Sequence, residues 1–329
     1  MILVTGAAGH IGNVLVRELL NDGQRVRALV LPGEDTSSLE GLDIELMEGN
    51  VLEPHTLDQA LLGVEKVFHL AGIISIMPGQ NDVMRRVNVE GTKNMLAAAR
   101  KAGVKRLVYT SSIHALSRDW KGKINEKVPF DQFNSAGAYD RTKAEASLAV
   151  LEAVKDGLDA VIVCPTGVIG PYDYRGSEMG ELLRNFMLKK PHLMIEGAYD
   201  FVDVRDAARG HILAGERGRT GEVYILSGWQ IKIFQLKQMV QDALGLRSAT
   251  IHIPNWLAKL TAVFTPLYYR ITRQTPKFTG YSIETIQGNS DISCQKARKE
   301  LGYRPRKMLA TVADTVAWWL QRAKKIKVR

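Results

Sequence analysis

Two pairs of residues in the middle of the chain could together move a proton to or from an oxygen atom. Tyr139 and Lys143 are four positions apart where a helix is predicted to begin, so both side chains lie on one face. An ammonium group close to a phenol stabilises the phenolate and lowers the tyrosine pKa towards neutral pH. Ser111 and Ser112 end an apolar strand, at the sheet edge where ligands bind. Each pair alone is more typical of a surface contact or a helix cap.

A glycine-rich segment near the N-terminus indicates what these residues could act with. An apolar strand runs directly into Gly6, Gly9 and Gly12, and a helix is predicted from Ile11. Glycines there permit a tight turn and close backbone approach, and the helix N-terminus offers free N–H groups to a pyrophosphate. The spacing is G-x-x-G-x-x-G, not the G-x-G-x-x-G of most dehydrogenases. We expect a dinucleotide to contact Gly6, Ala8, Gly9, His10, Ile11 and Gly12.

The end of the second strand favours NAD over NADP. An acid there binds the ribose hydroxyls, whereas an arginine binds a 2′-phosphate, and Leu31 is neither. Residues 28–55 contain no Lys or Arg, and they include Glu34, Asp35, Glu40, Asp43, Glu45, Glu48 and Glu53. A 2′-phosphate would enter a negative field, although hydroxyl groups at 36–38 could still bind it. Asn50, after the third strand, could hydrogen-bond the adenine.

The elements that must position these residues follow an alternating pattern. Strands are predicted at 2–5, 26–31, 44–47, 66–70, 106–110 and 160–164. Helices are predicted between them at 11–21, 56–62, 82–102 and 139–155. The strands are nearly continuous in Val, Ile and Leu, as expected when helices cover both faces of a parallel sheet. The pattern predicts an α/β fold with a Rossmann-type, doubly wound parallel sheet.

The pattern of residue types changes after Pro165, and this change predicts a smaller, mostly helical C-terminal substrate lobe. Strands are predicted at 201–204 and 222–226, with helices at 179–189, 206–216, 234–244, 254–273, 294–301 and 309–323. We assign residues 1–167 and 199–229 to the dinucleotide-binding domain, and residues 168–198 and 230–329 to the substrate lobe. An apolar stripe within 256–271 could cap a hydrophobic substrate pocket or simply pack in the core of that lobe.

Composition and charge narrow the class of protein. The 329 residues have a net charge of +9, and 11 of the 44 Lys and Arg residues lie within 296–329, against only two acids there. We interpret this excess as a solvated helix end rather than a nucleic-acid or anionic-membrane surface. The two cysteines, the absence of a metal-ligand cluster, and the lack of a leader or a spanning segment favour a cytoplasmic protein without a metal.

The motifs jointly resemble the extended short-chain dehydrogenases/reductases over essentially the whole chain. They are TGAAGHIG at 5–12, HLAG at 69–72, NVEGT at 88–92, YTSS at 109–112, YDRTK at 139–143, PTGVIGP at 165–171, FVDVRD at 201–206 and LGYRP at 301–305. Within that family, YTSSI and PTGVIGP are most similar to dihydroflavonol-reductase-like and 3β-hydroxysteroid-dehydrogenase-like enzymes.

The resemblance implies a role for each matching residue. Ser112 would be the catalytic serine, Tyr139 the acid/base, and Lys143 the group that tunes the tyrosine and holds the nicotinamide ribose. The cofactor would also contact Leu31, Asn50, Val51, Leu70, Ala71, Gly72, Thr110, Tyr139, Pro165, Thr166, Gly167 and Val168. We expect Ile74, Ile113, His114 and Tyr172 to face the substrate. In many relatives the helices at 82–102 and 139–155 form a homodimer face, so a homodimer is possible here.

The implied activity is that of an NAD(P)-dependent oxidoreductase, either a ketone or aldehyde reductase or a secondary-alcohol dehydrogenase, with a small hydroxysteroid- or dihydroflavonol-like substrate. Leu31 replaces the arginine of NADP-dependent members of this branch, and Ile113 and His114 replace the acidic pair of sugar-nucleotide dehydratases. Thr166 lies near the position where epimerases usually have asparagine. Two alternatives remain: a nucleotide-sugar epimerase with tightly bound NAD, and an NAD(P)-sensing regulator without turnover.

Overall fold

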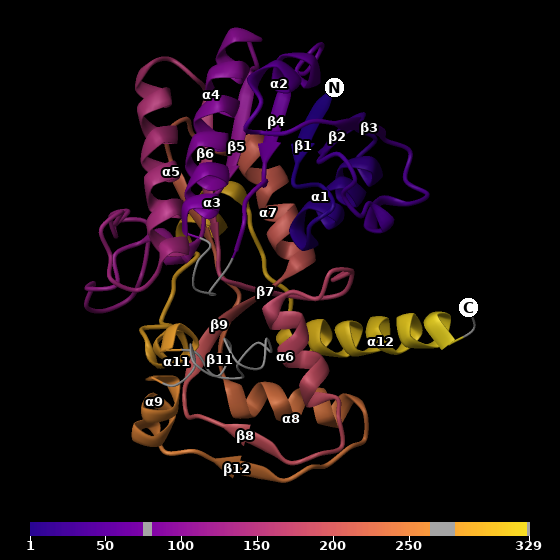
Figure 1. Cartoon of the computed structure of the whole chain (residues 1–329), viewed down its shortest axis with the longest axis vertical. Helices are drawn as coiled ribbons and strands as arrows, with labels where there is room; N and C mark the ends of the chain where they lie inside the picture. The colour runs from indigo at the N-terminus through magenta and orange to yellow at the C-terminus, as the bar shows by residue number, and fades with distance from the viewer. Residues whose placement is uncertain (75–80, 264–279, 328–329) are drawn as a thin grey trace.

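A seven-stranded parallel sheet forms the upper part of the molecule (Figure 1). The computed structural model describes residues 1–74, 81–263 and 280–327. The strand order is β10-β6-β5-β4-β1-β2-β3, and each neighbouring pair is parallel. The strands are β1 (Ile2–Thr5), β2 (Val26–Val30), β3 (Glu45–Glu48), β4 (Lys66–His69), β5 (Arg106–Thr110), β6 (Ala160–Pro165) and β10 (Val223–Leu226). The order reverses between β1 and β4, and their carboxyl ends therefore open the crevice in which such sheets bind ligands.

Helices cover both faces of this sheet, as the apolar strands require. One face packs against α1 (His10–Asn21) and α7 (Val204–Arg217), whose residues share a core with β1 and β2. The other face packs against α2 (Pro54–Ala60), α4 (Gly91–Lys101) and α5 (Ala138–Lys155), which share a second core with β5 and β6. The predicted Rossmann-type, doubly wound architecture is confirmed.

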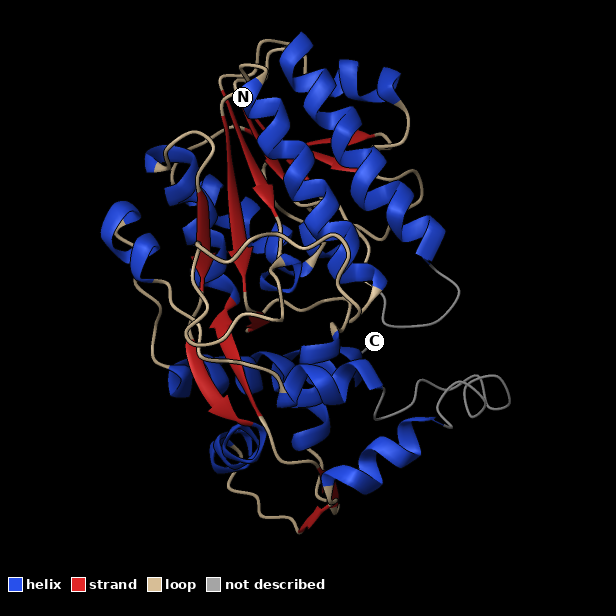
Figure 2. Cartoon of the chain, turned by 90° about the vertical axis from the view of Figure 1, so that its left-hand side faces the viewer, coloured by secondary structure: helices blue, strands red, loops and turns tan. Residues whose placement is uncertain are grey.

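A smaller lobe lies below the sheet in Figure 1. It contains a three-stranded sheet of β11 (Trp229–Lys232), β9 (Ala198–Asp203) and β7 (Gly167–Ile169), and a pair of β12 (Thr250–His252) with β8 (His192–Met194). Its helices are α6 (Glu178–Phe186), α8 (Ile233–Ala243), α9 (Asn255–Val263), α11 (Gly280–Gln287) and α12 (Met308–Lys327). The view turned by 90° shows these helices gathered at one end of the strands of the large sheet (Figure 2).

The lobe differs from the sequence prediction in its strands. β7, β8, β11 and β12, each of three or four residues, were not predicted. The predicted strand 201–204 is β9, which pairs with β7 and β11 instead of joining the large sheet. α7 and β10 do return to the large sheet. The division into the two proposed domains stays a prediction, as does a homodimer.

Two predicted helices also differ from the structure. The helix expected at 82–102 consists of α3 (Asn81–Arg85), a π-helical turn η2 (Arg86–Glu90) and α4. Of the helix expected at 254–273, α9 covers the part up to Val263, and 264–273 lie outside the described residues. Trp256, Leu257 and Leu260 of the apolar stripe are exposed, and the side chains of the rest of the stripe lie outside the described residues. No helix in the described ranges is long and apolar enough to cross a membrane.

Candidate active site

The loop between β1 and α1 is closed so tightly that glycine is required at two of its positions. Gly6 has φ of 65°, and a Cβ there would lie 2.8 Å from the Ala71 backbone nitrogen. A Cβ at Gly12 would overlap the Gly6 carbonyl oxygen. Gly9 is the N-cap of α1 and has no side chain to occupy the free N–H groups of the first turn. The loop therefore provides a backbone cradle with the chemistry that a dinucleotide pyrophosphate requires.

Ser112, Tyr139 and Lys143 come together where β5 ends and α5 begins. All three are buried, with 6, 8 and 5% of their surfaces exposed. The Lys143 ammonium donates a hydrogen bond of 2.7 Å to the carbonyl oxygen of Thr110, the last residue of β5. The Ser112 side chain lies close enough to the Tyr139 phenol to oppose part of the rise in its pKa that burial causes. The structure thus brings together the three side chains that the sequence selected for acid–base chemistry.

The two neighbouring serines have different surroundings. Ser111 shares a hydrogen bond of 2.7 Å with the Ser147 hydroxyl, which in turn donates to the Lys143 carbonyl oxygen, so Ser111 faces the middle of α5. The Ser112 hydroxyl accepts a hydrogen bond from the His114 backbone nitrogen and lies beside Tyr139. Of the two, Ser112 is the one placed to reach a substrate oxygen held next to the phenol.

Burial controls the protonation of the tyrosine and the lysine. Burial raises the pKa of Tyr139 well above its usual value, and the Ser112 side chain opposes this effect. Burial lowers the pKa of Lys143 to about 8. The sequence predicted a lowered pKa for Tyr139, and that is wrong for the chain by itself. The physical reason is that the phenol is desolvated while the Lys143 ammonium bonds the Thr110 carbonyl.

Asn88 joins the loop after β4 to helix α5. Its side chain accepts a hydrogen bond from the Ile73 backbone nitrogen and donates to the Ile73 carbonyl and to the Thr142 hydroxyl. A Cβ at Gly72 would lie 3.1 Å from the Asn88 Oδ1 and 3.5 Å from the Lys143 Nζ, so these three residues meet at one point. Asn88 was not proposed as a site residue, although NVEGT marks its position. It lies in the π-helical turn η2, a feature frequent at functional sites.

A second buried hydrogen-bond network joins the end of β1, which precedes the glycine loop, to β4 and α4. The Thr5 hydroxyl is 2.8 Å from the His69 Nδ1 and accepts from the Ala71 backbone nitrogen. The other His69 ring nitrogen is 3.2 Å from the Thr92 hydroxyl. Burial, with a contribution from Lys143, lowers the pKa of His69 to about 3, so the ring is neutral. His69 therefore fixes the ends of β1 and β4 against α4, and both of its ring nitrogens have partners.

Beside Tyr139, an aromatic and charged cluster contains residues from four parts of the chain. The His114 Nε2 is 2.6 Å from the Tyr199 hydroxyl, and the two rings are stacked. Asp140 is fully buried and accepts hydrogen bonds from Arg118 at 2.6 Å and from the Tyr281 hydroxyl at 2.8 Å. Burial lowers the pKa of His114 to about 4, so this ring is neutral too. Apart from His114, these residues were not selected from the sequence.

Several of the predicted cofactor residues have side chains with other partners. The Thr110 hydroxyl pairs with the His211 ring at 2.8 Å, and the Asn50 side chain bonds the Leu52 nitrogen and Glu53 within its own turn. The His10 ring pairs with the Pro171 carbonyl at 3.0 Å. The rest lie where the sequence placed them, at the ends of β2, β4 and β6 or in the segments that follow β3 and β6. They are Leu31, Val51, Leu70, Ala71, Gly72, Pro165, Thr166, Gly167 and Val168.

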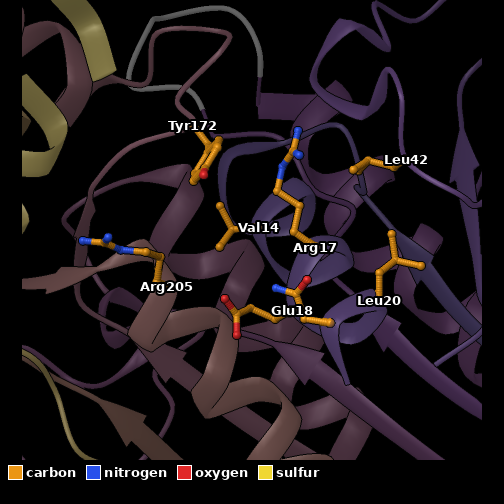
Figure 3. A pocket seen from close by; sticks show the side chains of 8 residues that line it. Val14, Arg17, Glu18, Leu20, Leu42, Tyr172 and Arg205 are labelled. Carbon is orange, nitrogen blue, oxygen red and sulfur yellow. The ribbon is translucent and has the colours of Figure 1, made fainter. Parts of the chain in front are cut away.

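Of the four predicted substrate residues, Ile113 and His114 lie beside Ser112, and Ile74 is exposed after β4. Tyr172 does not join the catalytic side chains. Its ring packs on the Arg17 guanidinium at 5.0 Å, and its carbonyl accepts from Asn13. It lines a cavity of about 300 Å³ on the outer side of α1 with Val14, Arg17, Glu18, Leu20, Asn21, Leu42 and Arg205 (Figure 3).

Residues 2–227 match the NAD dependent epimerase/dehydratase family. The chain belongs to this family. It is 36% identical over 323 residues to sterol demethylase protein B of Methylococcus capsulatus. The alignment covers 97% of this chain and 98% of that relative. It is 32% identical to a putative dihydroflavonol 4-reductase of Synechocystis, covering 96% of this chain and 93% of that one. Further relatives are described as 3β-hydroxysteroid dehydrogenases.

Among solved structures, that of gox2253 superposes with a TM-score of 0.85 at 33% identity and covers 98% of both chains. The expected resemblance to the extended short-chain dehydrogenases/reductases and to the named branch is confirmed, and the chain is an NAD(P)-dependent enzyme of that group. Within the described residues, no group of three His, Cys, Asp or Glu side chains could hold a metal ion.

Proposed function

We propose that the enzyme interconverts a ketone and a secondary alcohol at Ser112, Tyr139 and Lys143. The observation that carries this proposal is that the three buried side chains lie where β5 ends and α5 begins, with the Lys143 ammonium next to Gly72 and Asn88. In this proposal they supply a proton donor, an oxygen-binding hydroxyl and a positive charge next to the bound cofactor. A bound nicotinamide would supply or accept the hydride.

The side chains divide the work on the substrate oxygen. The Ser112 hydroxyl donates a hydrogen bond to that oxygen and so stabilises the alkoxide that develops during reduction. The Tyr139 phenol gives its proton to the same oxygen, and it takes the proton back when an alcohol is oxidised. Burial raises the pKa of Tyr139, so the phenol carries its proton before reduction, and the positive charge of Lys143 must offset the weaker acidity that burial causes. The Lys143 ammonium bonds the Thr110 carbonyl in the chain by itself, and we expect its positive charge to stabilise the phenolate once the proton has left.

The surroundings of Tyr139 support a polycyclic or aromatic substrate. His114 and Tyr281 lie with their ring centroids 5.9 Å apart, and His114 stacks on Tyr199. Because both His114 and the phenols are neutral, this wall suits an apolar ring system better than a charged sugar nucleotide. The names of the relatives, which include a sterol demethylase protein and a dihydroflavonol reductase, support the same class of substrate. We propose a steroid-like or flavonoid-like ketone or alcohol.

We propose NAD as the preferred cofactor, on the basis of the acidic segment 28–55.

The experiment that tests the proposed function has two steps. The purified chain is first denatured and the released nucleotide is quantified. The apo-protein is then assayed for oxidation of NADH and NADPH with a 3-ketosteroid, a dihydroflavonol and UDP-glucose. The proposal expects little released nucleotide and NADH oxidation with one of the two ketones. Stoichiometric NAD with epimerisation of UDP-glucose would instead establish the epimerase, and binding without any turnover would establish a sensor.

A further inference from the structure

The loop that follows β2 carries a carboxylate back to the end of that strand. Leu31, Pro32, Gly33 and Glu34 form a turn in which the Glu34 nitrogen donates to the Leu31 carbonyl. Gly33 has φ of 72°, so Pro32 and Gly33 occupy the positions that a type II turn favours. The turn lets Glu34 accept the Leu31 backbone N–H at 2.8 Å. An acid therefore lies at the end of β2, although the residue at that position in the sequence is leucine.

An arginine from a distant part of the chain meets this carboxylate. The Arg175 guanidinium donates to the Glu34 Oε1 at 2.7 Å and to the Asp35 carbonyl at 3.0 Å. Arg175 comes from the segment between β7 and α6, and 141 positions separate it from Glu34. The Glu34 side chain is 17% exposed and that of Arg175 is 42% exposed. The absence of Lys and Arg from residues 28–55 is therefore not an absence of positive charge from the folded ribose loop.

The same loop is fixed against the cofactor cradle. The Ser38 hydroxyl donates to the Ala8 carbonyl at 3.0 Å, and the Arg17 guanidinium donates to the Ser38 carbonyl at 2.8 Å. Arg17 also packs on the ring of Tyr172, which is three positions before Arg175. These contacts hold the Glu34–Arg175 pair at the end of the crevice where the group after β2 reads the adenosine ribose.

We infer that Glu34 and Arg175 together determine whether the bound adenosine ribose can carry a 2′-phosphate. The Glu34 carboxylate repels a phosphate and accepts from a ribose hydroxyl, while its salt bridge keeps the Arg175 guanidinium occupied. Neutralising Glu34 removes the repulsion and frees a guanidinium that can bind a phosphate. The ion pair between the loop after β2 and the segment before α6 thus determines the selectivity for NAD over NADP. This inference rests on the proposed function, in that it assumes that the crevice binds a nicotinamide dinucleotide.

The test measures dissociation constants for NADH and NADPH on the full chain by fluorescence titration. The variants are Glu34→Gln, Arg175→Gln and the double variant. Glu40→Gln is the matched control, since it removes an exposed acid of the same segment. We expect the unaltered chain to prefer NADH and Glu34→Gln to shift the ratio towards NADPH by about tenfold or more. The double variant should lose the gain in NADPH affinity, and Glu40→Gln should leave the ratio unchanged.

The other outcomes contradict either the inference or the proposed function. A Glu34→Gln shift no larger than that of Glu40→Gln overturns the inference, and so does an NADPH gain that persists in the double variant. A preference of the unaltered chain for NADPH overturns it as well. If the unaltered chain binds neither nucleotide, the proposed function falls together with the inference. Thermal unfolding of each variant distinguishes a change in selectivity from loss of the fold.

Discussion

The two walls around Tyr139 are built in different ways. The cofactor wall consists of short segments that each follow a strand of one sheet, and the Thr5, His69 and Asn88 side chains tie these segments together. The opposite wall is joined by contacts over long sequence separations, 85 positions for His114 with Tyr199 and 141 for Asp140 with Tyr281. The first wall follows from the strand order of one sheet, whereas the second depends on how the smaller lobe docks on that sheet.

The comparison separates what each wall contributes. Backbone groups and glycines dominate the cofactor wall, so we expect a change there to alter nucleotide binding directly. The opposite wall contains a partly buried ion pair and neutral rings, so we expect a change there to alter the stability of the docked lobe and the choice of substrate. Variants in the two walls should therefore have different signatures.

The largest effect on stability is expected for Gly12→Ala in the cofactor wall. The new Cβ would overlap the Gly6 carbonyl, a backbone atom that cannot move aside without opening the loop. We expect a loss of about 3 kcal/mol in the free energy of unfolding and loss of NADH binding. Urea denaturation and fluorescence titration measure the two effects. Gly9→Ala is the graded control because its Cβ would lie 3.2 Å from the same oxygen, and an equal loss there would contradict this explanation.

A smaller effect is expected for Arg118→Met in the opposite wall. This change leaves Asp140 buried without its ion-pair partner, and the cost should be about 2 kcal/mol because the Arg118 side chain is 29% exposed. Denaturant unfolding measures the loss, while NADH affinity should change little. The double variant Arg118→Met with Asp140→Asn should recover part of the stability. No recovery would show that the packing of Arg118 on Tyr281, rather than its charge, is what matters.

The smallest effect is expected in the pH dependence of catalysis. Burial lowers the pKa of Lys143 to about 8, so the ammonium is lost at a lower pH than for an exposed lysine. The value of kcat/KM for NADH reports groups of the free enzyme, and it should fall by about tenfold per pH unit above that pKa. In Lys143→Arg the guanidinium stays charged, so the alkaline decline should disappear. An unchanged decline in that variant would assign it to another group.

The contrast between the walls also explains how much could be predicted from the sequence. The serine pair 111–112, Tyr139 and Lys143 follow from a strand end and an i, i+4 spacing, and the glycine loop directly follows a strand. The choice of Ser112 within the pair came from the family resemblance. The seven parallel strands were predicted because apolar runs alternate with helical periods. The contacts of Arg175 and Tyr281 could not be predicted, since they depend on the docking of segments that lie far apart in the chain. The π-helical turn at Asn88 was missed because its apolar pattern resembles that of an ordinary helix.

The central claim is that Tyr139 transfers the proton at a site where the nucleotide is held by other groups. The most direct test compares Tyr139→Phe with the unaltered chain in single-turnover reduction of the ketone that the enzyme accepts, alongside NADH titration. We predict that the rate of hydride transfer falls by about a thousandfold, while the dissociation constant for NADH changes by no more than about twofold. A retained rate, or a loss of NADH affinity that accounts for the loss of rate, would contradict the claim.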